Sequence, residues 1–315
     1  MNIKHLILSM LTILFVLTAC ASPTRQSKAP LNVVATTSIV GDVVRQVGGD
    51  LVNVNILLPI GSDPHSYQPS PQDVAKISEA TLVFANGAGL EEFLQNLIES
   101  AGAANRLVNV SEGIELKDFG AHEHEHEGED EQEHEMHSHE GGDPHTWVDP
   151  NNVIIWVKNI ETKLSQIDSA NSAIYQTNAE NYIAQLKELD AWIREQVKAV
   201  PDENRRLVTD HMVFGYFAER YGFEQIGAVI PGYSTLASPS AQDIAQIEDA
   251  IREFGVKAIF VGKTVNPTIA QRIAEDTGIK LVFVYLGSLS EAGGPAASYL
   301  DYMRYNVSEI VNALK

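Results

Sequence analysis

Three histidines of this chain, His65, His145 and His211, have the residue type and the sequence context of metal ligands. The first two each end an Asp-Pro-His segment, and the third directly follows an aspartate. Imidazole nitrogen is a favoured ligand of zinc and its first-row neighbours, and an adjacent carboxylate can orient the ring. Of the ten histidines, six fall in one acidic run and one in the N-terminal leader, which leaves these three. This distribution indicates a metal site.

The acidic run, residues 122–140, alternates histidine with nine acidic residues and has Met136 as its one apolar side chain. Such a composition predicts a disordered segment that cannot form a core. We interpret it as a weak zinc scavenger or sensor, and the alternative is a solvated acidic loop with incidental histidines. Its candidate weak ligands are His122, His124, His126, His134, His137 and His139.

The first twenty residues have the pattern of an export leader. Lys4 precedes the apolar stretch 6–17, which is too short for a stable membrane span, and small residues then precede Cys20. This order resembles a bacterial lipobox, in which the chain is cleaved before the cysteine and the thiol is acylated. An ordinary secretory leader is the alternative. We expect a signal peptide over 1–19, a flexible tether over 20–30 and an extracytoplasmic protein anchored to a bacterial membrane through Cys20.

Composition narrows the possible partners. The net charge of −20 argues against nucleic acid and fits an exported protein that collects cations. Cys20 is the only cysteine, so neither a disulfide framework nor a thiolate ligand is expected. The sequence contains no phosphate-binding glycine loop, so we do not expect it to bind ATP. A hydrophobic fraction of 44% permits a sizeable core, and the length permits two domains.

Short β-branched runs alternate with amphipathic stretches on both sides of the acidic run. The runs are rich in Val, Ile or Leu, as buried strands of parallel sheets are. The pattern predicts an α/β fold with two lobes, each with a central parallel sheet flanked by helices. The expected strands are 31–37, 52–58, 81–85, 106–110, 206–209, 225–230, 257–261 and 280–285. The expected helices are 39–47, 71–79, 89–100, 212–221, 241–254 and 267–277, with another beginning near Asn151.

One long helix is expected between the lobes. Residues 173–200 contain no Gly or Pro, and apolar residues recur in steps of three and four from Tyr175 to Val200. That spacing marks one face of a single helix about 40 Å long. We interpret it as a stiff spine along both lobes, and a surface helix of one lobe is the alternative. The expected organisation is an N-terminal lobe over 31–170 with the acidic loop 121–142, a linker helix over 171–200 and a C-terminal lobe over 201–315.

The three histidines fall at matching places in this pattern. His65 and His211 each follow a predicted strand, and His145 lies between the acidic run and the next predicted helix. Residues beyond the carboxyl ends of parallel strands line the ligand crevice of an α/β sheet. We therefore expect ligands from both lobes to meet in the cleft between them.

Five segments carry a family resemblance. They are residues 33–42, residues 63–71, residues 143–150, Thr209-Asp210-His211 with Phe214, Tyr216 and Phe217, and Ser288-Leu289-Ser290 with Tyr299, Leu300, Asp301, Met303, Tyr305 and Asn306. Together they span nearly all of the mature chain, which resembles the solute-binding lipoproteins of zinc and manganese ABC importers (cluster A-I, ZnuA-like and TroA-like proteins). In that family the first two histidines are ligands, which carries over to His65 and His145. The third ligand is a glutamate in many manganese binders and a histidine in zinc binders, and here it is His211.

The resemblance implies a function. The chain would capture Zn²⁺ outside the cytoplasm, as a monomer without enzymatic activity, and deliver it to the membrane permease of an ABC importer. A separate ATPase subunit would drive transport. A manganese-binding homologue of the same type, carrying Mn²⁺, is the alternative.

The fourth ligand position departs from the family pattern. By the spacing to Tyr299 and Asn306, Gly287 stands where family members often have an aspartate. Three imidazoles then leave one open place, which water or Glu291 would fill. Neutral nitrogen ligands suit zinc better than manganese, which favours oxygen. The other explanation for Gly287 is a backbone conformation with a positive angle.

Two other classes of function fit parts of the sequence. An open three-histidine zinc site is also what a hydrolase uses to activate water. The one match to the metalloprotease pattern His-Glu-x-x-His is at 122–126, within the acidic run, where no helix is expected to align the two rings. A structural surface lipoprotein or adhesin would not need three converging histidines.

We predict that deletion of residues 121–140 leaves one tight zinc site, because His65, His145 and His211 lie outside the deleted segment. Calorimetry on the deletion variant should retain one high-affinity event and lose only the weak additional events. Loss of the high-affinity event would place the primary site in the acidic run.

Overall fold

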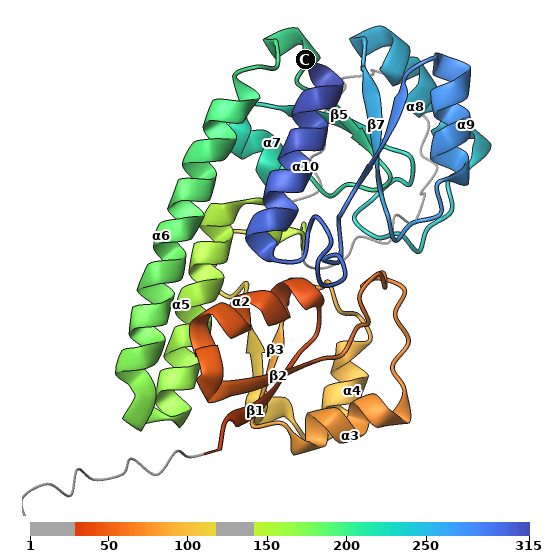
Figure 1. Ribbon diagram of the computed structural model, residues 1–315. Coiled ribbons are helices and arrows are strands. Elements are labelled where there is room, and N and C mark those ends of the chain that lie inside the picture. The colour runs from red at the N-terminus through yellow and green to blue at the C-terminus, as the bar shows by residue number, and fades with distance from the viewer. Residues whose placement is uncertain (1–28, 118–141) are drawn as a thin grey trace, which may run out of the picture. The chain divides into compact units, whose positions relative to one another are not determined.

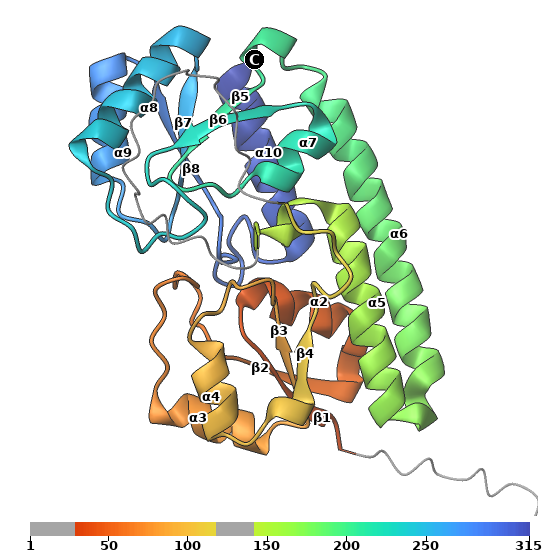
Figure 2. The ribbon, with the colours of Figure 1, turned by 180° about the vertical axis from the view of Figure 1, so that it is seen from behind.

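Two parallel four-stranded sheets organise the protein, which we describe from a computed structural model covering residues 29–117 and 142–315. Residues Leu31–Lys315 form one compact unit (Figures 1 and 2). The N-terminal lobe has the strand order β2-β1-β3-β4, and the C-terminal lobe has the order β6-β5-β7-β8. The strands are β1 (Leu31–Ala35), β2 (Val52–Ile56), β3 (Leu82–Ala85), β4 (Leu107–Asn109), β5 (Arg206–Thr209), β6 (Glu224–Ala228), β7 (Ala258–Gly262) and β8 (Lys280–Val284).

Capping residues mark the starts and ends of several helices. Ser70 and Ser240 form capping boxes at the starts of α3 and α8, which satisfy free backbone N–H groups. Three helices of the C-terminal lobe, α7, α8 and α9, end at a glycine in the left-handed conformation. The α-helices are α2 (Ser38–Gly48), α3 (Pro71–Glu79), α4 (Leu94–Ser100), α5 (Pro150–Ile167), α6 (Ser172–Val197), α7 (Gly215–Tyr221), α8 (Ala241–Phe254), α9 (Thr268–Thr277) and α10 (Tyr299–Leu314).

The 26-residue helix α6 packs along both lobes. It contacts α2 in the N-terminal lobe and α10 in the C-terminal lobe, with α5 beside it over much of its length (Figure 1). The predicted spine is therefore confirmed, and the alternative of a helix confined to one lobe is wrong. Its buried face consists of Tyr175, Ala179, Tyr182, Leu186, Leu189, Ile193 and Val197.

One hydrophobic cluster continues from one lobe into the other. It includes Val33 of β1, Trp156 of α5, Leu186 of α6 and Phe260 of β7, all fully buried. Smaller clusters cover the opposite face of each sheet. Because burial of apolar surface contributes about 25 cal/mol per Å², separating the lobes along this cluster would be costly. The shared core thus limits the lobes to small relative movements.

The observed elements match the predicted order closely. All eight predicted strands are present, with ends within two residues of the expected positions. The predicted start of α4 at residue 89 is wrong, because Gly87, Ala88 and Gly89 all have positive φ angles and the helix begins only at Leu94. The predicted start of α7 at residue 212 is three residues too early, and α10 is a helix absent from the prediction.

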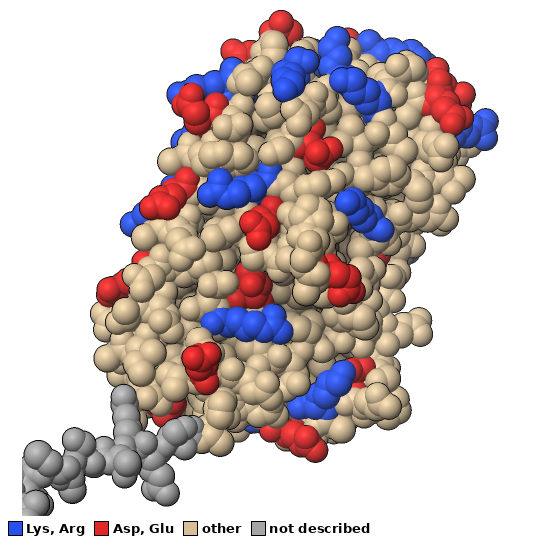
Figure 3. Space-filling view, viewed as in Figure 1, with Lys and Arg blue, Asp and Glu red and all other residues tan. Residues whose placement is uncertain are grey.

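Charge is mixed on the surface. On the face shown in Figure 3, acidic and basic side chains alternate over both lobes without a large area of one sign. Among the residues described here, no helix has both the length and the apolar character needed to cross a bilayer.

We predict that Leu186→Ala lowers the free energy of unfolding of the metal-free protein by about 2–5 kcal/mol, because it opens a cavity under α6. Gln185→Ala, one residue away on the exposed face of the helix, is the control and should change stability by less than about 0.5 kcal/mol. Urea denaturation measures both. Equal effects of the two substitutions would contradict the packing described for α6.

Candidate metal centre

Loops from the carboxyl ends of strands supply the candidate ligands. His65 lies in the connection after β2, and His211 lies in the connection after β5. In each sheet the second strand lies on one side of the first strand and the third strand lies on the other side. The strand order therefore reverses between β1 and β3 and between β5 and β7. This switch point is where ligands bind in open α/β sheets. His145 directly precedes the short 3₁₀ turn Thr146–Val148, which leads into α5.

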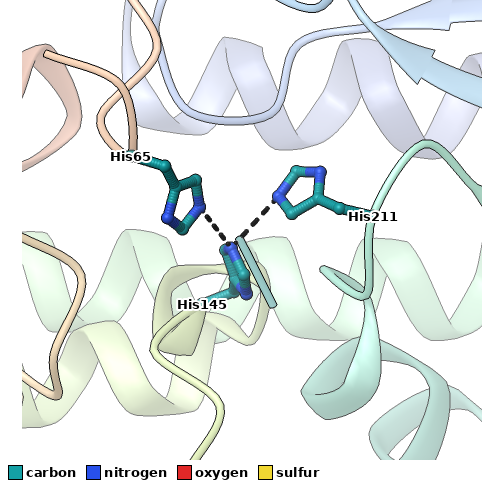
Figure 4. Close-up of side chains that lie close together, drawn as sticks. All are labelled: His65, His145 and His211. Atoms are coloured by element: carbon teal, nitrogen blue, oxygen red, sulfur yellow. Dashed lines mark hydrogen bonds between the residues drawn. The ribbon is translucent and has the colours of Figure 1, made fainter. Parts of the chain in front are cut away.

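The three imidazole rings converge (Figure 4). Nε2 of His145 lies 3.2 Å from Nε2 of His65 and 3.2 Å from Nε2 of His211. One ligand atom from each histidine lies within 4.8 Å of the others. Among the described residues, His65, His145 and His211 form the group of side chains that could hold a metal ion. Figure 4 shows the rings approaching from three different segments of the chain.

The spacing of the nitrogens suits a bound cation. In a tetrahedral zinc site with Zn–N bonds near 2.05 Å, neighbouring nitrogens are about 3.3 Å apart. The observed 3.2 Å separations match that value. Three ring nitrogens at this distance cannot all satisfy one another through hydrogen bonds, whereas a cation accepts a lone pair from each.

Buried carboxyl groups set the orientation of two rings. Asp143 Oδ1 lies 2.8 Å from Nδ1 of His145, and Asp210 Oδ1 lies 2.5 Å from Nδ1 of His211. Asp210 is itself fixed, because its Oδ2 accepts the backbone N–H of Gly262 at 2.6 Å. A carboxylate that accepts the Nδ1 proton leaves Nε2 with a free lone pair, which is the form of histidine that binds metal.

Asp63, the acid beside His65, has a different role. Its Oδ1 accepts the backbone N–H of His65 at 3.0 Å. Its Oδ2 accepts the hydroxyl group of Thr235, a residue of the C-terminal lobe, and that of Ser66 at 3.3 Å. The three acid–histidine pairs of the sequence are therefore not equivalent in the structure.

Burial controls the protonation of the site. It lowers the pKa of His145 well below its ordinary value, and the neighbouring His211 lowers it further, so the His145 ring stays neutral at neutral pH. Burial also raises the pKa of Asp143 to about 7, against the hydrogen bond from the backbone N–H of His145. Asp143 Oδ2 has no hydrogen-bond partner among the described residues. A cation bound at Nε2 would favour the ionised carboxylate and thus complete the site.

The His145 loop is fixed against the C-terminal lobe. The indole N–H of Trp147 donates to the Tyr302 hydroxyl at 3.0 Å and to the backbone oxygen of Leu286 at 3.2 Å. The hydroxyl of Tyr299 donates to the backbone oxygen of Trp147 at 2.7 Å. Because the Trp147 ring also packs against the His145 ring, with centroids 5.2 Å apart, α10 helps to position this histidine.

The expectation about Gly287 needs correction. Gly287 does line the cavity of the histidine cluster, but its φ angle is not positive, so the proposed backbone requirement is wrong. A Cβ atom at this position would lie 2.5 Å from Cδ and 2.9 Å from Cγ of Pro64, in the loop of His65. Glycine is needed here because the two lobes approach each other closely, and no room remains for a fourth side-chain ligand.

Glu291 has no place in the cluster. Its side chain is exposed, and it belongs neither to the group of converging ligand atoms nor to the residues that line the cavity. The cavity has a volume of about 10 Å³. That space suits one small ion or one water molecule.

Several predicted sites lie outside the described residues. These are the lipidation site Cys20 and the weak loop ligands His122, His124, His126, His134, His137 and His139.

Several residues around the cluster have roles that sequence reasoning did not assign. Thr235 and Trp147 act through contacts with distant segments. Glu91 is buried and accepts hydrogen bonds from the Thr36 hydroxyl and from the backbone N–H groups of Asn86 and Gly87, and the Asn86 side chain donates to the backbone oxygen of Pro144, the residue before His145. For Glu91, a single acid after the glycine-rich stretch 87–89 was the one available signal.

Comparisons with known proteins agree with one family. The family model described as the periplasmic component A of zinc-uptake complexes, ZnuA, matches residues 33–313. The manganese-binding lipoprotein MntA of Halalkalibacterium halodurans is 33% identical over 285 residues, which cover 90% of this chain and 88% of that protein. The manganese ABC transporter substrate-binding lipoprotein PsaA of Streptococcus pneumoniae is 32% identical over 304 residues, covering 95% and 94%.

Solved structures resemble the whole unit. The periplasmic zinc-binding protein TroA of Treponema pallidum superposes with a TM-score of 0.79 at 25% identity, covering 90% of this chain and 99% of that one. The manganese-bound periplasmic metal-binding protein of Candidatus Liberibacter asiaticus gives a TM-score of 0.76 at 27% identity, covering 90% and 100%.

We predict that Gly287→Ala lowers the free energy of unfolding by about 1–3 kcal/mol, because the added methyl group meets the Pro64 ring. It should also weaken metal binding by displacing the loop that carries His65. Pro64→Ala in the same chain removes Cγ and Cδ and should recover part of both losses. Melting curves and metal titrations on the two single variants and the double variant test this, and a fully stable Gly287→Ala would contradict it.

Proposed function

We propose a function for this chain from the premise that it belongs to the ZnuA family, the periplasmic component of metal-uptake complexes. It is an extracytoplasmic metal-binding subunit of an ABC importer. It captures a divalent transition-metal ion at His65, His145 and His211 and presents it to a membrane permease. The observation that supports this most directly is the convergence of three Nε2 atoms from both lobes, 3.2 Å apart in two pairs.

Zinc is the metal that this ligand set suits best. The converging ligand atoms are three imidazole nitrogens without a carboxylate oxygen. Nitrogen ligands of this kind favour zinc over manganese, both by ligand type and by the order of affinities of divalent metals. The tetrahedral position left by the three rings would be filled by water, because Gly287 offers no side chain.

Manganese is the second candidate. Two of the relatives described above carry manganese in their names and a third was solved with manganese bound, while the Treponema pallidum protein carries zinc in its name. Neighbouring nitrogens of an octahedral site are also about 3 Å apart when the metal–ligand bonds are somewhat longer. Ligand chemistry, rather than the spacing of the rings, therefore supports zinc.

A binding protein fits the site better than a hydrolase. Members of this family are solute-binding proteins of transporters. A hydrolytic zinc enzyme needs an open ligand position next to a substrate pocket. The cavity enclosed by the cluster, about 10 Å³, has the size of one ion or one water molecule.

Delivery of the ion requires partners. We expect the acylated Cys20 to hold the monomeric protein at the membrane, where the two lobes meet the permease while a separate ATPase subunit drives release. The histidines of residues 122–139 would bind further metal weakly and supply it to the cluster. The shared core restricts lobe movement, so the ion would leave through small changes in the loops that carry the ligands.

We predict that His211→Ala weakens zinc binding by orders of magnitude while the metal-free protein stays folded, because the core and α6 do not depend on the metal. Zinc at about a hundredfold excess over its dissociation constant should stabilise the wild type by about 2.7 kcal/mol. The zinc-induced rise in melting temperature should nearly disappear in the variant.

Thermal melts with and without zinc measure this effect, and magnesium serves as a control ion that prefers oxygen ligands. Competition titrations should place zinc above manganese in affinity. A zinc-induced shift that is unchanged in His211→Ala would remove this residue from the site.

A further inference from the structure

The three ligand histidines are held in two different ways. The rings of His145 and His211 are each bonded through Nδ1 to a buried aspartate. His145 and His211 are 1% and 3% exposed, respectively, whereas His65 is only partly buried. Two of the ligand rings are thus hydrogen-bonded to an aspartate nearby in sequence, and for His65 it is the backbone N–H that is bonded to the nearby aspartate, Asp63.

The His65 loop also contacts the opposite lobe. The connection from β2 to α3, residues 57–70, is long for an αβ protein. Within it, the backbone N–H of Gly61 donates to the Ser288 hydroxyl at 2.9 Å, and the Pro64 ring lies close to Gly287. Both partners belong to the C-terminal lobe.

Thr235 makes the contact nearest to the ligand. It lies in the connection between β6 and α8, lines the cluster cavity and donates its hydroxyl to Asp63 Oδ2. The other oxygen of the same carboxylate accepts the backbone N–H of His65 at 3.0 Å. One carboxylate therefore connects a hydroxyl of the C-terminal lobe to the backbone of a ligand in the N-terminal lobe.

His65 also lies between the cluster and a larger space. A cavity of about 260 Å³, lined by residues that include Glu92, Gln95 and Tyr233, shares only His65 with the residues lining the cluster cavity. Among the three histidines of the cluster, His65 is therefore the one that borders both cavities.

We propose that Thr235 is a positioning residue for metal capture: through Asp63 it holds the His65 loop in place when the two lobes are together. The inference rests on the proposed function, because it assumes that His65 is a ligand. It links one contact between the lobes to completion of the ligand set. If the Thr235–Asp63 hydrogen bond breaks, the loop is released and His65 is the first ligand to leave.

Thr235→Val tests the proposal, because valine keeps the shape of threonine and removes the hydroxyl. Zinc dissociation, followed by stopped-flow transfer to a chelator, should become about tenfold faster, as expected for loss of a hydrogen bond to a carboxylate. Thr235→Ser retains the hydroxyl and should return the rate close to that of the wild type. Ser234→Ala is the matched control, since the Ser234 hydroxyl accepts the backbone N–H of Leu236 instead.

The His65→Ala background separates positioning from a general effect on stability. If Thr235 acts through His65, then Thr235→Val should not accelerate zinc dissociation further in that background. An unchanged rate in Thr235→Val alone, or an equal acceleration in the His65→Ala background, would overturn the inference. Failure of the proposed function has a different signature, because the wild-type protein would then bind neither zinc nor manganese tightly.

Discussion

The close approach of three imidazole nitrogens is the constraint on which the rest of the structure depends. Nitrogen atoms 3.2 Å apart in a buried space do not attract one another without a proton or a metal ion between them. Contacts from the surrounding fold must therefore hold the rings together. Asp143 and Asp210 fix the rings of His145 and His211 by hydrogen bonds. Contacts between the lobes, such as the Thr235–Asp63 hydrogen bond, hold the loop of the third ring beside the other two.

The spine helix and the shared core explain why this arrangement is stable. Because α6 packs along both lobes, the carboxyl ends of the two sheets keep a fixed separation. Polar contacts also join the two lobes. Leu289 donates its backbone N–H to the Ser38 hydroxyl at 2.9 Å, and Tyr299 donates its backbone N–H to Asp42 at 2.9 Å. A frame of this kind leaves the connecting loops, rather than the lobes, as the parts that adjust to a bound ion.

Local patterns were enough to predict most of the fold. The spacing of apolar residues along short runs of sequence predicts the eight strands and the spine helix. It also predicts that His65 and His211 follow the ends of strands. Features that depend on distant partners could not be predicted. The bond from Thr235 to Asp63 joins residues 172 positions apart, and the role of Gly287 depends on a proline ring from the other lobe. Nothing in their neighbouring residues marks either contact.

The charge of the site suggests why an aspartate is absent at Gly287. Two buried carboxyl groups, those of Asp143 and Asp210, lie one imidazole ring away from the centre of the cluster. When ionised, they balance the two positive charges of a divalent ion through neutral rings. A third buried carboxylate at residue 287 would leave excess negative charge, which is costly in a site of low dielectric constant. Glycine at residue 287 lets Pro64 approach, and on the proposed function it also adds no further charge beside the ion.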